Sequence, residues 1–130
     1  MKKEDAAGGQ SQKIAERSFD FAVRVIKLCQ FLDERPGVGR VLMPQILRCG
    51  TSIVSNVEEA QAGQSRADFI SKMSIALKEA RETHIRLRLL DAAEVVAGKR
   101  LEPILQESDE IMRILGAIVV RSKRGGAEGN

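Results

Sequence analysis

Hydrophobic residues recur at three- and four-residue steps along most of this chain, which is the period of an amphipathic α-helix. Residues 35–39, which read RPGVG, interrupt the pattern, because proline disfavours helical geometry before it and glycine permits a turn. Residues 65–68, which read SRAD, form a capping box that opens another helix, and Gly98 ends that helix. The pattern predicts helices over residues 12–34, 40–62, 66–97 and 101–122.

The lengths of these segments and of the turns between them define the expected architecture. Helices of roughly 20 to 30 residues that are joined by short turns run antiparallel to their neighbours. We therefore expect an all-α protein, one antiparallel up-down-up-down four-helix bundle. Polar and glycine-containing ends flank it, so residues 1–11 are expected to be a flexible arm and residues 123–130 a disordered tail.

The first two helices carry more than a core-facing stripe. Beside its core stripe, the first helix has a second set of apolar residues, namely Phe19, Val23, Ile26 and Phe31. A helix that is apolar on more than one side is central in a domain or buried in an oligomer, and a small bundle encloses no helix fully, so self-association is expected. The second helix has a stripe of polar residues, namely Gln45, Arg48, Ser52, Ser55, Asn56 and Glu59. Such a stripe permits close approach of another helix or lines a wet interior.

Composition and charge restrict the class of protein without identifying its function. The chain is 43% hydrophobic but only 3% aromatic, so its core must be aliphatic. A net charge of +3 is compatible with a polyanionic partner and does not require one. Cys29 and Cys49 lack CxxC spacing and are read as reduced, partly buried thiols. No apolar segment is long enough to span a membrane or to act as a signal peptide, so a cytoplasmic location is expected.

Residue patterns typical of catalysis and metal binding are missing from the sequence. The single histidine, His84, has Arg81 three positions before it, where a di-metal bundle site needs glutamate. There is no G-x-S-x-G motif, and the Gly37/Gly39 pair lacks the strand and third glycine of a phosphate loop. We expect no enzyme activity, no cofactor, no metal and no small-molecule substrate. The weaker alternative is an enzyme that uses Glu59 and Glu82 as a carboxylate pair.

Two groups of basic side chains are candidates for contact with nucleic acid. On one face of the third helix lie Arg81, His84 and Arg88, and at the end of the fourth helix lie Arg121, Lys123 and Arg124. Arginine suits bidentate contact with phosphate. Each group also has a structural interpretation. Neighbouring acids or another subunit pair with the first group, and the second complements the dipole of the fourth helix.

Two stretches resemble a known bacterial family. Residues 45–60 read QILRCGTSIVSNVEEA and residues 65–83 read SRADFISKMSIALKEARET. They resemble the signature of the four-helix-bundle proteins encoded in intervening sequences of 23S ribosomal RNA genes, over about residues 13–120. The matching positions are Ser52, Ile53, Asn56, Glu59, Phe69, Ile70, Ala76 and Glu82. Two features depart from the pattern: Ala60 stands where many members have glycine, and Lys78 and Glu79 replace a small pair.

The resemblance implies an up-down bundle that assembles as a homopentamer around a central channel. It also implies that Ser52, Asn56, Glu59 and Glu82 have structural or interface roles, and it brings no catalytic residues. A related group, the accessory variability determinants of diversity-generating retroelements, is similar in fold and works with a reverse transcriptase and its RNA. The leading hypothesis is a module that binds RNA or a ribonucleoprotein, and the alternative is a protein–protein scaffold.

Overall fold

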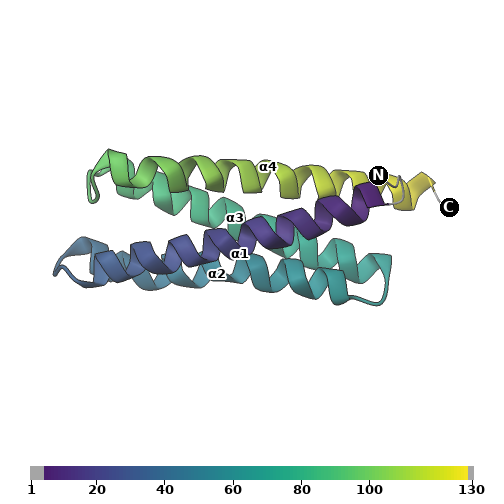
Figure 1. Ribbon diagram of the computed structural model, residues 1–130, viewed down its shortest axis with the longest axis horizontal. Coiled ribbons are helices and arrows are strands. Elements are labelled where there is room, and N and C mark those ends of the chain that lie inside the picture. Colours follow the sequence, from purple (N-terminus) through teal and green to yellow (C-terminus); the bar gives the residue numbers. More distant parts are fainter. Residues whose placement is uncertain (1–4, 129–130) are drawn as a thin grey trace.

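The computed structural model describes residues 5–128, and within that range it contains four α-helices and no strand (Figure 1). The helices are α1 (Asp5–Asp33), α2 (Val38–Ala62), α3 (Arg66–Ala92) and α4 (Gly98–Glu128). Each helix packs on the next in the chain, and α4 returns to α1, which closes the ring of four. The start of α1 and the end of α4 lie at the same end of the bundle. The predicted antiparallel four-helix bundle is confirmed.

The core is almost wholly aliphatic, as the composition requires, and Phe21 is its one fully buried aromatic side chain among the described residues. Side chains from all four helices fill it, the largest being Ile14, Phe21, Ile46, Ile53, Met73, Leu87, Leu90, Leu101, Ile111 and Leu115. Three buried polar groups, Ser18, Thr83 and Ser108, each donate a hydrogen bond to a backbone carbonyl of their own helix. Their hydroxyls therefore need no partner from another helix to be satisfied.

Helices α1 and α2 approach each other closely at Gly50. A Cβ atom added there would lie 2.7 Å from Cγ1 of Val25 and 2.9 Å from its Cγ2. Both residues are completely or almost completely buried. The absent side chain at Gly50 is therefore what lets the two backbones approach, and this positions α2 against α1.

The end of α3 differs from the prediction. The helix stops at Ala92 and not near residue 97, because Glu94 adopts a left-handed conformation with φ of 56°. The amide of Val95 then donates to the carbonyl of Leu90 at 2.9 Å, and the amide of Glu94 to that of Asp91 at 3.0 Å. This pair of bonds is a Schellman motif, which usually places glycine where Glu94 stands.

The outer ends of the bundle are more helical than expected. Helix α1 begins at Asp5, so residues 5–11 of the expected arm are helical, and α4 continues to Glu128 through most of the expected tail. Each added residue of an established helix gains one hydrogen bond, so a packed helix extends past its last tertiary contact. The start of α3 follows the prediction, since Ser65 Oγ accepts a hydrogen bond from the amide of Asp68 at 3.0 Å. No helix within residues 5–128 is long and apolar enough to cross a membrane.

Candidate nucleic-acid interface

The first predicted basic group lies along the contact between α3 and α4, where His84 is half-buried. Its Nδ1 atom is 2.8 Å from Oγ of Ser108, and that hydroxyl donates its only proton to the carbonyl of Leu105. The histidine must therefore be the donor, so Nδ1 carries a proton. Only Nε2 of His84 is left to meet a ligand, and the residue's main contact is structural.

Arg81 and Arg88 flank His84 on α3, and both are exposed. In the structural interpretation of this group, nearby acids such as Asp91 pair with the two arginines. Within residues 13–125, where side chains are described, no carboxylate pairs with either arginine. Their charges therefore remain available for an anionic partner.

The second basic group lies in the last turns of α4. Arg121, Lys123 and Arg124 are exposed, but α4 continues to Glu128, so these cations precede the final turn of the helix. The favourable interaction of a cation with the helix dipole falls off within that turn. The dipole interpretation of this group is therefore weaker than the sequence suggested.

Arg66, at the start of α3, joins the second group. Its Nη1 atom donates to the carbonyl of Ser122 at 3.2 Å, which brings this fourth cation beside α4. Sequence reasoning missed Arg66 because nothing local shows that the start of α3 meets the end of α4. The two basic groups remain separate, since Arg66 and Arg81 are about four turns, or about 22 Å, apart along α3.

The residues that match the family signature line the contact between α2 and α3. Arg48 bridges Glu79 at 3.4 Å and Glu82 at 3.2 Å. The hydrogen bond that Arg48 donates to Glu82, followed by the charge of Glu79, raises the pKa of Arg48. One and two turns further along α2, Ser52 Oγ donates to the carbonyl of Arg48 and Asn56 Nδ2 donates to that of Ser52. Arg48 and Glu59 of the polar stripe therefore pair with α3, whereas Ser52 and Asn56 bond to the backbone of their own helix.

Glu59 and Glu82, the alternative carboxylate pair, are held apart. Glu59 pairs with Lys72 at 3.0 Å, whereas Glu82 pairs with Arg48. Lys72 and Glu82 are ten residues apart on α3, or about 15 Å. The two carboxylates do not act on one atom in this arrangement. Among the described residues, no group of three or more His, Cys, Asp or Glu side chains is placed to hold a metal ion.

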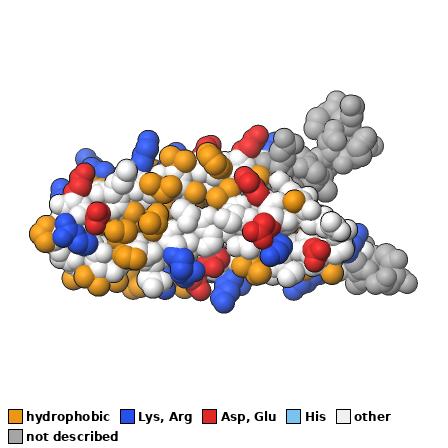
Figure 2. All heavy atoms as spheres, turned by 90° about the horizontal axis from the view of Figure 1, so that it is seen from below, with side chains coloured by type: hydrophobic (Ala, Val, Ile, Leu, Met, Phe, Trp, Pro, Cys, Tyr) orange, Lys and Arg blue, Asp and Glu red, His pale blue; other side chains and the backbone are white. Residues whose placement is uncertain are grey.

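Large apolar side chains stay exposed on several helices of the bundle. Of the second apolar set on α1, Phe19 is 56% exposed, and Val23 and Ile26 are also exposed. Phe31 differs, because it is partly buried between the guanidinium groups of Arg35 and Arg100. Further exposed apolar side chains lie on α2 and α3, namely Val38, Val41, Leu42, Ile75, Ile85 and Leu89. Viewed from the side of α2, hydrophobic side chains are denser toward the α1–α2 turn (Figure 2).

Fold and surface together define a small four-helix bundle whose exposed side chains include two basic groups and several large apolar residues. Residues 10–117 match the family model of the 23S rRNA-intervening sequence protein. This chain therefore belongs to that family, as the signature in α2 and α3 predicted. None of the curated proteins matches its sequence.

A solved structure supports the same assignment. It is a protein of unknown function from the S23 ribosomal protein family of Bacteroides thetaiotaomicron, and it is 42% identical to this chain. The match covers 85% of this chain and 97% of the other, with a TM-score of 0.77. The bundle and the family are therefore established, and the partner is a separate question.

Proposed function

We propose that this protein is a non-enzymatic homo-oligomeric module, a pentamer, that binds RNA or a ribonucleoprotein through the α3–α4 side of each bundle. The observation that carries the proposal is the set of exposed cations on these helices that pair with no acidic side chain among residues 13–125. Arg81 and Arg88 form one group, and Lys123 and Arg124 form the other. Phosphate contacts of this kind need no base-specific geometry.

Two groups about 22 Å apart suit an extended polyanion better than a single small anion. A nucleic-acid backbone presents charges at regular intervals and can contact both groups in one bound conformation. The resemblance to retroelement accessory proteins makes a reverse-transcriptase complex a candidate ribonucleoprotein. The name of the family supports an association with ribosomal RNA genes.

The oligomer is supported by the exposed apolar side chains of α1. Phe19, Val23 and Ile26 lie on one stripe of the helix, at spacings of four and three residues. Contiguous apolar surface on a small domain marks an interaction site. A second copy of the chain is the partner we propose for this stripe.

The nucleic-acid proposal is tested by fluorescence anisotropy with a labelled single-stranded RNA of about 20 nucleotides, longer than one typical site. Two double variants, R81A/R88A and K123A/R124A, remove one basic group each. The variant K13A/K99A removes the same charge from exposed lysines outside both groups. We expect at least one of the first two to weaken binding by about tenfold or more, as the loss of two charge-assisted contacts requires. Equal weakening by K13A/K99A would show that only net charge matters.

The oligomer is tested independently by native mass spectrometry. The double variant F19E/I26E places two charges on the apolar stripe of α1, and we expect it to yield monomers. The matched variant I75E changes an exposed isoleucine on α3 and should leave the assembly intact. A monomeric parent protein at micromolar concentration would overturn the oligomer.

The protein–protein scaffold is the second candidate, and the same apolar surface favours it. If the parent protein is monomeric and binds no RNA, this surface is then the partner site. Variants of Phe19 and Ile26, and not those of Arg81 and Arg88, would then abolish partner binding. RNA binding and protein binding are therefore distinguished by which variants lose binding, those of the basic groups or those of the apolar stripe on α1.

A further inference from the structure

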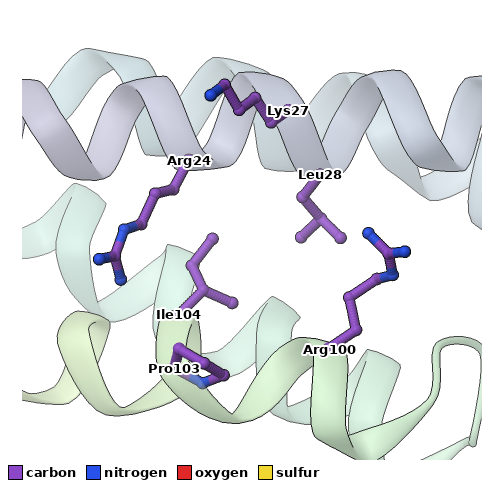
Figure 3. A pocket seen from close by; sticks show the side chains of 6 residues that line it. All are labelled: Arg24, Lys27, Leu28, Arg100, Pro103 and Ile104. Atoms are coloured by element: carbon purple, nitrogen blue, oxygen red, sulfur yellow. The ribbon is translucent and has the colours of Figure 1, made fainter.

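A pocket of about 240 Å³ opens between α1 and α4, away from both basic groups described above. Its lining combines three cations with three apolar side chains, namely Arg24, Lys27 and Leu28 from α1 and Arg100, Pro103 and Ile104 from α4. Arg24 extends from α1 toward α4 and Arg100 extends from α4 toward α1, on either side of Leu28 and Ile104 (Figure 3). Lys27 lies along α1 at the rim.

Among the described residues no acidic side chain lines this pocket, whereas the neighbouring turn of the same two helices has acids. Seven residues earlier on α1, Arg17 faces the same neighbour and is bound by Glu107 and Glu110 of α4, both at 2.7 Å. A step of seven residues along α1 corresponds to seven residues back along the antiparallel α4. At that level the chain has Arg100 and Pro103 where Arg17 meets its two glutamates.

The charges of the pocket therefore remain without a counter-charge. Within the described residues, Arg24 and Lys27 make no ion pair or hydrogen bond. Arg100 lies 4.0 Å from the ring centroid of Phe31, which holds its guanidinium in place without neutralising it. Arg24 and Arg100 lie on opposite sides of the apolar floor, so a phosphate can meet the Arg24 guanidinium while the rest of a ligand covers the floor.

The apolar residues at the floor of the pocket indicate which chemical group a ligand would carry besides a phosphate. Leu28 and Ile104 belong to the core, at 7% and 6% exposure, and Pro103 lies beside them on the exposed surface of α4. A free inorganic anion gains nothing from such a floor, whereas a flat ring system covers it. The volume lies just below the range of drug-sized ligand sites, so it suits one small ligand with part of it in solvent.

We propose that this pocket binds a nucleoside monophosphate. The phosphate contacts Arg24 at one side of the floor, the base covers Leu28, Pro103 and Ile104, and Arg100 bounds the floor at its other side. This inference does not rest on the proposed RNA function, because the residues are different and a protein that binds no RNA can still bind a nucleotide. The 5′-phosphorylated end of an RNA carries the same chemistry, and the experiment separates the two sources.

Isothermal titration calorimetry with AMP at low salt tests the proposal on the full chain. Arg24→Gln removes the phosphate contact, and Pro103→Glu puts a carboxylate on the floor without removing a cation. Glutamate is tolerated at this exposed position of α4 because it favours helix. The matched control, Lys78→Gln, makes the same change in net charge on an exposed part of α3.

We expect AMP to bind the parent protein with a Kd below about 1 mM, the weakest value that this titration resolves. Arg24→Gln should weaken it at least about tenfold, the effect of one charge-assisted contact. Pro103→Glu should abolish binding, and Lys78→Gln should change it less than twofold. Inorganic phosphate and adenosine should each bind at least about tenfold more weakly than AMP, because each lacks one half of the ligand.

Several results would overturn the proposal. They are no binding of AMP, equal binding of AMP and inorganic phosphate, or equal loss in Lys78→Gln and Arg24→Gln. Binding of a 5′-phosphorylated trinucleotide but not of AMP would place the site on RNA ends and would also reject the free nucleotide. Circular dichroism of each variant shows that the bundle is intact. Failure here leaves the RNA proposal standing, because Arg81, Arg88, Lys123 and Arg124 are unchanged in these variants.

Discussion

Replacing Gly50 by alanine tests whether close approach of α1 and α2 sets the geometry of the bundle. The added Cβ would lie 2.7, 2.9 and 3.2 Å from three carbons of Val25. Val25 is completely buried and β-branched, so its side chain has essentially one rotamer in a helix and nowhere to rotate. Either the helices separate or the valine leaves its rotamer.

The expected cost follows from two opposing terms. Alanine is favoured over glycine inside a helix by about 1 kcal/mol. Overpacking of a filled core costs about 1–3 kcal/mol, and contact with three atoms at once places Gly50 at the upper end. We expect G50A to lower the free energy of unfolding by about 2 kcal/mol. For a domain of this size that lowers Tm by about 6–10 °C.

Gly116 provides the matched control, because a Cβ atom added there meets nothing within 4 Å. It lies inside α4, so G116A gains the helix propensity alone and should raise the stability by about 1 kcal/mol. Urea and thermal unfolding are followed by circular dichroism at 222 nm. In the double variant V25A/G50A the cost should be smaller than the sum of the two single costs, by about 1 kcal/mol or more. If G50A is as stable as G116A, the contact does not constrain the helices.

Three further variants or conditions test local features of the bundle. Glu94→Gly should stabilise the protein by about 1 kcal/mol, because glycine adopts the left-handed conformation at the end of α3 without strain, and E94A should give no such gain in urea unfolding. Ser108→Ala removes the acceptor of the proton on Nδ1 of His84 and should cost about 1–2 kcal/mol, and no measurable change would show that the bond does not contribute. Burial, with a smaller contribution from Cys49, raises the pKa of the Cys29 thiol from 9.0 to about 11. The folded state therefore holds this proton more tightly, so stability should fall as the pH rises from about 9 to 11, and Ellman's reagent at pH 8 should react quickly only after unfolding.

The fold could be predicted because its cause is local and periodic. Apolar residues at helical spacing, the break at residues 35–39 and the cap at Ser65 fix the four helices and their order. The end of α3 could not be predicted, because Glu94 has a conformation that glutamate rarely adopts and no sequence signal announces it. Helix α4 extends to Glu128 because an established helix propagates from its packed part. The extension could not be predicted, because the last residues are polar and have no apolar pattern.

The candidate sites were harder to predict than the helices, because they depend on contacts between helices. The two basic groups could be found, since each lies on one helix. The contribution of Arg66 to the second group was missed, as it requires the ends of α3 and α4 to meet. The pocket of Arg24 and Arg100 was missed for the same reason. The polar stripe on α2 was noticed, but only the structure shows that Arg48 uses it to bind Glu79 and Glu82.

The central claim, that the basic side of α3 and α4 contacts a nucleic-acid backbone, is tested most directly by the salt dependence of RNA binding. The slope of log K against log salt for single strands is about −0.7 for each phosphate neutralised. We expect binding that weakens steeply with salt, and a slope that is less steep by about 1.4 in K123A/R124A. An unchanged slope in K123A/R124A and in R81A/R88A, or no RNA binding even at 50 mM salt, a low concentration on this scale, would contradict the account.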